Sequence, residues 1–255
     1  MSVPSRTSDL LAVPHGFFGR EGGVSTGAMA SLQCGFGADD DLTSIRENRR
    51  IVADSLIAGA GLASVRQVHG TAVVRASGEP AEDERPEADA IVSSEPGLLI
   101  GILTADCAPV LLCDAKAGVV GAAHAGWKGA LGGVCEAVIA GMERIGARRE
   151  DIAAAVGPCI ARASYEVDEG FRRRFLNADD ENERFFADGR AGHAQFDLEG
   201  FVASRLAAAG AGRVDLMGED TYAQPQRYYS YRRATHRGEP SYGRQISVIG
   251  LLPAR

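Results

Sequence analysis

The sequence predicts an α/β fold of the α+β type: a single domain over residues 1–255 in which mixed β-sheets are flanked by helices. Three features of the 255-residue chain support this prediction. Short apolar runs bounded by Gly, Pro and Asp are typical of buried strands, and longer segments with apolar residues at helical spacing are typical of helices. The two kinds of segment alternate without the strict strand–helix–strand order of a doubly wound sheet, and neither an internal repeat nor a clear linker divides them.

The first part of the chain combines two loops with one helix. Residues 22–37 contain five glycines and small polar residues, which predicts an ordered but irregular loop. Residues 43–60 have apolar side chains at roughly helical spacing, with Thr43 as the candidate N-cap. The acidic residues 76–89 include two prolines and predict a surface loop, because strand-like apolar runs resume directly after them.

Strands and helices alternate through the rest of the chain. Buried strands are expected over residues 98–103, 110–113, 119–123, 152–156 and 246–252. Helices are expected over residues 130–145, 164–176 and 197–209. Gly146 is expected to end the first of these helices, and Ser164 and Asp197 are the candidate N-caps of the other two.

The composition is that of an ordinary globular protein and excludes two classes of partner. Hydrophobic residues make up 45% and charged residues 24% of the chain. The net charge of −7 argues against a nucleic-acid surface, which needs a basic face, although a local cationic pocket can still bind a small anion. No apolar run approaches the ~20 residues that span a bilayer, so no membrane association is expected.

The N-terminal segment and the cysteines indicate a cytoplasmic protein. Residues 1–16 lack the basic and then apolar pattern of a secretory signal. The five cysteines are odd in number and irregularly spaced: Cys34, Cys107, Cys113, Cys135 and Cys159. We expect reduced thiols that are available for a metal or for catalysis.

A cysteine and two histidines lie at the ends of apolar runs. Cys107 follows the predicted strand 98–103, His124 directly follows the predicted strand 119–123, and His69 lies earlier in the chain. One Cys with two His is a ligand set for a divalent transition metal that leaves a coordination position open for chemistry. Their spacing matches no local metal motif, so the residue types alone leave this hypothesis open.

Three alternatives stand beside the metal site. Cys107 can be a core thiol, with His69 and His124 bonded to backbone carbonyls. Cys107 can instead be a thiolate nucleophile with His124 as its base and Asp106 as a turn or orienting residue, which predicts a Cys–His amidohydrolase. Two His and one Cys are also the ligands of a blue-copper centre, but five histidines are too few for a four-copper oxidase.

Several short motifs occur in order along nearly the whole chain, from about residue 17 to residue 252. They are Gly22-Gly23-Val24-Ser25, Ala30-Ser31-Leu32, Glu47-Asn48-Arg49, Gln67-Val68-His69-Gly70, Thr104-Ala105-Asp106-Cys107, His124-Ala125-Gly126-Trp127-Lys128-Gly129, Gly157-Pro158-Cys159-Ile160, Tyr165-Glu166-Val167 and Ser230-Tyr231-Arg232-Arg233. Together they resemble the laccase-domain family, also called YfiH-type or polyphenol-oxidase-like proteins. No single motif is specific, but the combination is.

The resemblance implies a fold, a metal and a reaction. It implies a zinc site made of His69, Cys107 and His124, with copper as the alternative metal. The implied substrates are purine nucleosides and phosphate: phosphorolysis of adenosine, inosine, guanosine or methylthioadenosine, together with adenosine deamination. No obligate protein partner is predicted. The implied fold is similar to that of cysteine deamidase toxins, which keeps the amidohydrolase alternative open, and the older family name adds copper-dependent polyphenol oxidation.

Candidate catalytic residues follow from these hypotheses. Cys107 and His124 belong to every catalytic alternative, and Asp106 is a candidate acid or base for deamination, as is Glu166. Phosphate needs cationic donors, for which arginine is best suited. Six cations are candidates: Arg46, Arg49, Lys128, Arg232, Arg233 and Arg244. The resemblance favours Arg49 with Asn48, and Arg46 lies on the same predicted helix.

Three further positions bear on the site. Trp127 is interpreted as a packing anchor for its turn in preference to a platform for the purine base. The chain departs from the family pattern at Gln33, where Asn is usual, and at Asp220, where Cys is usual. Neither departure touches the three candidate metal ligands.

Overall fold

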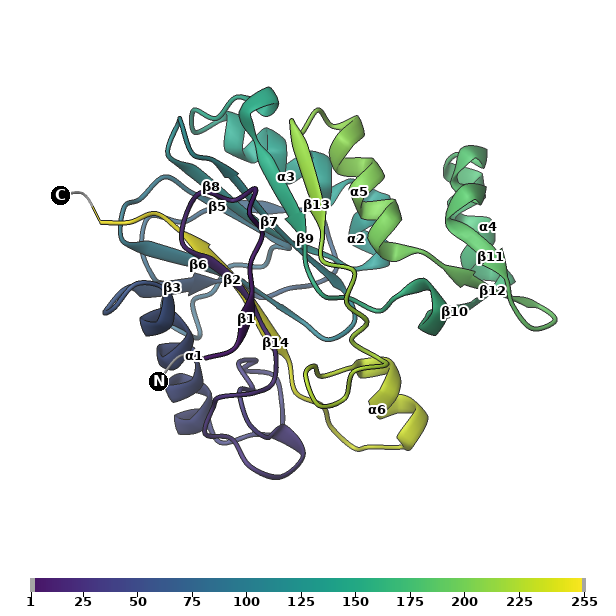
Figure 1. The fold of residues 1–255 in the computed structure, drawn as a ribbon, viewed down its shortest axis with the longest axis horizontal. Coiled ribbons are helices and arrows are strands. Elements are labelled where there is room, and N and C mark those ends of the chain that lie inside the picture. The colour runs from purple at the N-terminus through teal and green to yellow at the C-terminus, as the bar shows by residue number, and fades with distance from the viewer. Residues whose placement is uncertain (1–2, 254–255) are drawn as a thin grey trace.

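The computed structural model describes residues 3–253 and arranges them in layers (Figure 1). A five-stranded and a six-stranded sheet lie face to face, and a shared apolar core fills the space between them. One helix covers the outer face of the five-stranded sheet, and three helices cover the outer face of the six-stranded sheet. The predicted mixed α/β fold is therefore confirmed.

The five-stranded sheet has its longest strand near the centre. Its order is β1 (Ser5–Arg6), β2 (His15–Phe18), β14 (Gln245–Gly250), β6 (Leu98–Thr104) and β3 (Gly61–Ser64). Successive side chains of β6 point to opposite faces, as the period of a strand requires. Leu99 packs toward helix α1 (Leu42–Leu56), whereas Ile100 and Ile102 pack toward the other sheet. Burial on both faces explains why this strand is a continuous apolar run.

The six-stranded sheet is built around an antiparallel pair. Its order is β13 (Arg213–Leu216), β9 (Ala153–Val156), β7 (Ala108–Asp114), β8 (Val119–Ala125), β5 (Ala90–Ser93) and β4 (Val73–Arg75). Helices α2 (Trp127–Gly132), α3 (Val134–Glu143) and α5 (Leu198–Ala208) cover its outer face. On β7, Val110 and Leu112 face these helices while Leu111 and Cys113 face the five-stranded sheet.

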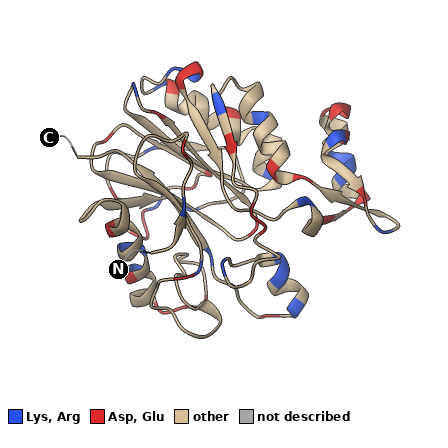
Figure 2. Ribbon diagram, viewed as in Figure 1, with Lys and Arg blue, Asp and Glu red and all other residues tan. Residues whose placement is uncertain are grey.

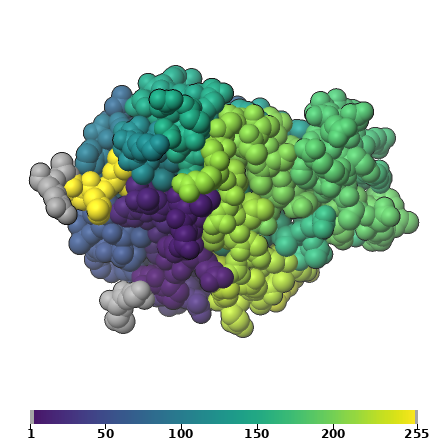
Figure 3. All heavy atoms as spheres, turned by 45° about the horizontal axis from the view of Figure 1, so that its top comes forward, coloured from purple at the N-terminus to yellow at the C-terminus, as the bar shows by residue number. Residues whose placement is uncertain are grey.

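A smaller lobe projects from this body (Figures 1 and 3). It contains β10 (Glu166–Asp168), helix α4 (Glu169–Ala178), β11 (Phe186–Asp188) and β12 (His193–Phe196), with the three strands forming a separate sheet. Aromatic rings join the lobe to the body: the Trp127 ring centroid lies 4.9 Å from that of Phe171, and Phe175 lies 5.0 Å from Phe201. Trp127 is thus a packing anchor, as its position in the sequence suggested.

The predicted strands and the helix over residues 197–209 are confirmed, with Asp197 accepting a hydrogen bond from the Gly200 backbone N–H as N-cap. The prediction of one continuous helix over residues 130–145 was wrong. The chain breaks it into α2 and α3 at Gly133, whose φ of 105° lies in the left-handed region that favours glycine.

Two predicted N-caps were also wrong. Helix α1 starts at Leu42 with Asp41 as its N-cap, because the Asp41 carboxylate accepts the Ser44 backbone N–H at 2.9 Å; Thr43 lies inside the helix. The helix expected to begin after Ser164 begins at Glu169, where the Asp168 carboxylate accepts from the Phe171 backbone N–H. Strand β10 occupies the intervening residues because it pairs with β12.

Helix α6 (Tyr231–Arg237) and four 3₁₀ turns complete the described elements. The turns cover Gly27–Met29, Arg149–Asp151, Arg162–Ser164 and Asp180–Phe185. Within residues 3–253, no helix combines the length and the apolar character needed to cross a membrane. Acidic and basic residues are interspersed over the outer helices (Figure 2).

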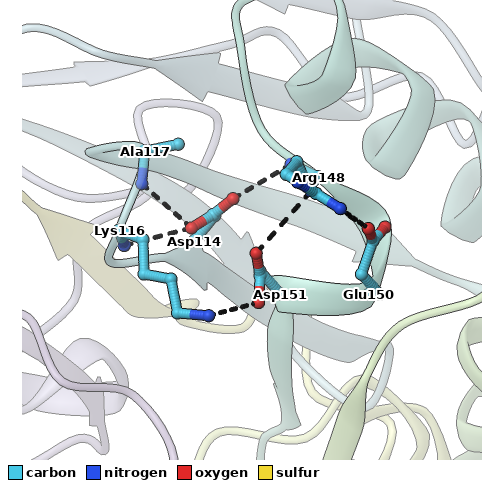
Figure 4. Close-up of polar contacts among 6 residues, drawn as sticks. All are labelled: Asp114, Lys116, Ala117, Arg148, Glu150 and Asp151. Carbon is cyan, nitrogen blue, oxygen red and sulfur yellow. Dashed lines mark hydrogen bonds and ion pairs between the residues drawn. The ribbon is translucent and has the colours of Figure 1, made fainter.

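A buried aspartate fixes the turn at the end of β7 (Figure 4). The Asp114 carboxylate is 1% exposed and accepts backbone N–H groups from Lys116, Ala117 and Arg148 at 2.9–3.0 Å. Ion pairs outside it join Lys116 and Arg148 to Asp151. Asp114 is a structural carboxylate, at the opposite end of β7 from Cys107.

His15 gives the fold a defined pH dependence. Its Nε2 accepts the Ser8 backbone N–H at 2.9 Å and its Nδ1 donates to the Val13 carbonyl, so the buried ring is held neutral. Burial lowers the pKa of His15, against the smaller raising effect of the Val13 bond. A lowered folded-state pKa means that the contribution to stability is present above the unfolded pKa near 6.5 and is lost as the pH falls below it.

We therefore expect the free energy of unfolding to fall between about pH 7.5 and about pH 5 more steeply in the wild type than in His15→Gln. Glutamine keeps an acceptor for Ser8 but does not titrate. Urea denaturation at both pH values measures the difference. Equal slopes for the two proteins would show that His15 does not cause the pH dependence.

Candidate metal centre

The metal-ligand candidates meet at one edge of the two large sheets. Residues 105–107 connect β6 of the first sheet to β7 of the second, which places Cys107 directly before β7. The antiparallel β7–β8 register pairs Pro109 with His124 and so brings the end of β8 beside Cys107. His69 comes from the loop between β3 and β4.

The three side chains form a compact donor set. Their ligand atoms all lie within 4.8 Å of one another, and the Cys107 Sγ is 4.0 Å from the His69 Nε2. A Cβ placed on Gly126 would lie only 3.0 Å from the Cys107 Sγ and from the His69 Cδ2. A side chain at this position would press on two of the three groups, so glycine leaves the cluster its room. One sulfur and two imidazoles this close fit a zinc or copper ion.

Sequence reasoning missed the residue that organises this cluster, Asp89. Its fully buried carboxylate accepts from the His124 Nδ1 at 2.7 Å and from the backbone N–H groups of Val68, His69 and Gly70 at 2.6–3.1 Å. The contact with His124 fixes the tautomer that leaves Nε2 free for a metal. The contacts with residues 68–70 shape the loop that carries His69.

The electrostatics favour charged forms of these groups. Burial raises the pKa of Asp89, but hydrogen bonds from His124 and the Gly70 backbone outweigh it and leave the pKa lowered. Burial likewise raises the pKa of the Cys107 thiol, yet the charge and hydrogen bond of His124 bring it below the usual value. The pKa of His124 is raised to about 9, because the charges and hydrogen bonds of Cys107 and Asp89 outweigh the lowering effect of burial. Without a metal this favours a Cys107 thiolate beside a protonated His124, and a bound metal would replace the Nε2 proton of His124 and contact the thiolate.

The chain is strained on both sides of the centre. Among residues 3–253, His69 (φ 61°) and Asp106 (φ 84°) are the two non-glycine residues in the left-handed region. Such conformations cost on the order of 1–3 kcal/mol and persist only where the surroundings impose them. Asp89 imposes the conformation of His69 through its backbone N–H bond.

Asp106 is held by the segment that leads into α6. Its Oδ1 accepts from the Thr221 hydroxyl at 2.7 Å, and its Oδ2 accepts from the Ser230 hydroxyl and the Arg232 backbone N–H at 2.9 and 2.6 Å. Burial raises the pKa of Asp106, and these hydrogen bonds oppose the rise. Both oxygens are engaged, so the visible role of Asp106 is to anchor the β6–β7 connection; its proposed acid–base role stays a prediction.

A cavity of about 330 Å³ opens onto the cluster. His69, Cys107 and His124 line it together with three arginines: Arg66, Arg85 and Arg244. Phe36 and Tyr242 add aromatic surface. The volume falls within the range of small-molecule sites.

The predicted phosphate residues lie outside this cavity. Arg46 and Arg49 line a neighbouring cavity of about 440 Å³, where Arg46 pairs with Glu82 at 2.6 Å. The buried Arg49 donates to the Leu62 carbonyl and the Ser64 hydroxyl. Asn48 is fully buried, and its side chain bonds to the loop over residues 22–37. Their role in phosphate binding stays a prediction.

The remaining candidates are engaged elsewhere. Glu166 pairs with Arg190 at 2.9 Å in the small lobe and does not line the metal cavity. Asp220 accepts from the Ser164 hydroxyl and the Tyr222 backbone N–H, so it fastens a turn. Gln33 bonds to both backbone polar groups of Gly35 and shapes the loop beside the cavity.

The structure predicts selective reactivity for Cys107. Cys107 is half-buried with a lowered pKa, whereas burial raises the pKa of the other four thiols. We expect about one equivalent of iodoacetamide to modify metal-free protein at neutral pH, on Cys107, with zinc protecting it. Peptide mass spectrometry locates the adduct. Modification spread over several cysteines, or no protection by zinc, would contradict this prediction.

Comparisons with known proteins cover nearly the whole chain. A model of the family described as "Multi-copper polyphenol oxidoreductase laccase" matches residues 14–252. A protein of Deinococcus radiodurans named "Purine nucleoside phosphorylase" is 41% identical over 253 residues, which cover 98% of this chain and 93% of that protein. The Escherichia coli protein named "Purine nucleoside phosphorylase YfiH" is 33% identical over 91% of each chain.

The fold agrees with a solved relative. A crystal structure of a Neisseria meningitidis protein superimposes with a TM-score of 0.88 at 32% sequence identity, covering 99% of this chain and 100% of that one. The overall fold of this chain is therefore one that experiment has already described.

Proposed function

The chain belongs to the family of laccase-domain, YfiH-type proteins. We propose that it is a zinc-dependent purine nucleoside phosphorylase that acts at the His69–Cys107–His124 site. The observation that carries the proposal is the convergence of three soft donors within 4.8 Å on a cavity of nucleoside size. The names of the relatives support the nucleoside as substrate. Adenosine, inosine, guanosine and methylthioadenosine are the proposed substrates.

The reaction breaks the bond between the base nitrogen and C1′ and forms a bond from phosphate oxygen to C1′. A zinc ion in this site would supply Lewis-acid chemistry at neutral pH. The chain's own residues prepare the site: Asp89 orients His124, Asp106 anchors the connection before Cys107, and Gly126 keeps the space open. We also propose adenosine deamination as a second reaction of the site.

The family description names several copper ions, but the histidines of this chain do not provide for them. Of the five histidines, all of which lie within residues 3–253, His69 and His124 line the metal cavity. His15 is bonded within the N-terminal segment, His193 contacts Arg190, and His236 contacts the Tyr222 hydroxyl. Copper at the single site remains the alternative metal for the proposal.

One observation favours a second candidate function. The cluster also has the arrangement of a nucleophile, a base and an orienting carboxylate. Cys107 would be the nucleophile and His124 the base, and the His124 Nδ1 lies 2.7 Å from the Asp89 Oδ1. A Cys–His amidohydrolase would use these groups without a metal. Chelation separates the two candidates, because it abolishes the first activity and spares the second.

Turnover of the four nucleosides with and without phosphate tests the proposed function. The zinc-loaded protein is expected to release free base only with phosphate, with ribose 1-phosphate formed in equal amount. Inosine formed from adenosine without phosphate would report deamination. Failure to release base from any of the four nucleosides in the presence of phosphate would refute the phosphorylase proposal.

A further inference from the structure

Two of the three arginines in the metal cavity have no acidic partner. Arg66 pairs with Glu87 at the rim. By contrast, the Arg85 Nε donates to the Glu82 backbone carbonyl and the Arg244 Nη2 donates to the Tyr242 hydroxyl. Within residues 3–253, no carboxylate lies within ion-pair distance of either guanidinium. Cations that line a cavity without a counter-charge are available to bind an anion.

Both guanidinium groups meet the same short wall of the cavity, residues 35–37. Arg85 lies over the Phe36 ring at 4.5 Å from its centroid. A Cβ on Gly35 would lie 3.1 Å from the Arg244 Cδ, and one on Gly37 would lie 3.6 Å from its Nη1. The Arg244 side chain therefore runs along this wall, and its guanidinium lies 4.9 Å from the Tyr242 ring centroid.

The same edge of the sheet positions Arg244 relative to the metal ligands. Arg244 directly precedes β14, and the register of β14 pairs Gln245 with Thr104 at the end of β6. Thr104 directly precedes the connection that ends at Cys107. The Arg244 carbonyl also accepts the Cys34 backbone N–H at 3.1 Å, which fastens Arg244 to the wall.

We propose that Arg85 and Arg244 form a phosphate subsite in the metal cavity and hold the inorganic phosphate of the phosphorolysis; this inference rests on the proposed function. Two guanidinium groups can donate several parallel hydrogen bonds to one phosphate, and both are already ordered by stacking and backbone contacts. The subsite and the donors of the metal centre line one cavity, so a nucleoside between them would present C1′ to the phosphate.

The other cations that the sequence offered as phosphate ligands make contacts elsewhere in the fold. Arg232 donates to the Glu166 carbonyl at 2.7 Å, and Arg233 donates to the Thr221 and Tyr228 carbonyls. The Lys128 Nζ lies 5.5 Å from the Trp127 ring centroid, away from the cavity wall. Of the six predicted cations, only Arg244 lines the metal cavity.

The test compares Arg85→Gln and Arg244→Gln with Arg66→Gln, which removes the same charge from the same cavity but from an arginine that is already paired. Arg46→Gln tests the alternative that phosphate binds in the neighbouring cavity, which Arg46 lines. Phosphate binding to the zinc-loaded proteins is measured by calorimetry, and the KM values for phosphate and nucleoside are measured separately. Zinc content and circular dichroism check each variant, and Arg244→Lys shows whether charge without the planar fork is sufficient.

We expect the Kd and KM for phosphate to rise at least about tenfold in Arg85→Gln and Arg244→Gln and to change less than about twofold in Arg66→Gln. The nucleoside KM should change little. A normal phosphate KM in both variants of an active enzyme would overturn the subsite and leave the proposed function standing. Phosphate binding that depends on Arg244 in a protein without phosphorolysis would support the subsite and refute the function.

A nucleotide could supply the same oxyanion, so adenosine 5′-monophosphate is titrated in parallel. Competition between the monophosphate and inorganic phosphate, lost in Arg244→Gln, is expected if both occupy the subsite. Binding of the monophosphate with no binding of inorganic phosphate would assign the subsite to the substrate's own phosphate and overturn the co-substrate role.

Discussion

Replacing Cys107 by Ala is expected to remove zinc from the purified protein and to lower nucleoside phosphorolysis by about a thousandfold or more. The variant lacks one of the three proposed zinc ligands, and zinc sites of this kind have a total binding free energy of about 10–16 kcal/mol that depends on all their ligands. Because Cys107 is half-buried and lies in a connection outside the cores, the fold should survive. Metal analysis and turnover on the same samples measure both effects.

Two further variants separate the metal site from its alternatives. Cys113→Ala removes a buried thiol from β7, the strand that Cys107 directly precedes, and should keep both zinc and activity. His69→Ala should lose both, because His69 is a proposed metal ligand but no member of the Cys107–His124–Asp89 arrangement. Full activity of His69→Ala would contradict the metal site and favour the amidohydrolase.

Replacing Asp89 by Asn is expected to weaken zinc binding by about ten- to a hundredfold and to destabilise the fold by on the order of 3 kcal/mol. The amide nitrogen would turn a donor toward the His124 Nδ1 or the backbone N–H groups of residues 68–70, all of which are donors. The ring of His124 would lose its fixed tautomer, and the loop that carries His69 would lose its anchor. Zinc titration and urea denaturation measure the two effects.

Asp114→Asn is the matched control for this variant. Asp114 is also buried and also accepts three backbone N–H groups, but it bonds to no metal-ligand candidate. It should lose a similar amount of stability while the zinc affinity of the folded protein stays unchanged. An equal loss of zinc affinity in both variants would show that Asp89 acts through general stability and has no specific role in orienting His124.

The sequence was sufficient for the parts that depend on local pattern. Strands buried on both faces, such as β6 and β7, appear as unbroken apolar runs, and the residues at their ends predicted where soft ligands gather. The break at Gly133 was not visible, because glycine inside an apolar segment is compatible with a continuous helix until tertiary packing selects a positive φ.

The organising residues of the site depend on contacts distant in sequence. Asp89 belongs to a segment that looks like a solvated acidic loop, and its role arises only when β5 pairs with β8 beside the loop of His69. Arg85 lies in the same acidic segment and reaches the cavity only because that segment folds against Phe36. One signal was present: Asp89 directly precedes an apolar strand, where an ionised side chain must find partners.

The most direct test of the metal-site account is a zinc titration of the metal-free wild-type protein with phosphorolysis followed at each step. The account predicts that activity is absent without metal, rises in proportion to bound zinc and stops rising at one zinc per chain. Full phosphorolysis by the metal-free protein, or activity that needs several metal ions per chain, would contradict a single His69–Cys107–His124 centre as the site of the reaction.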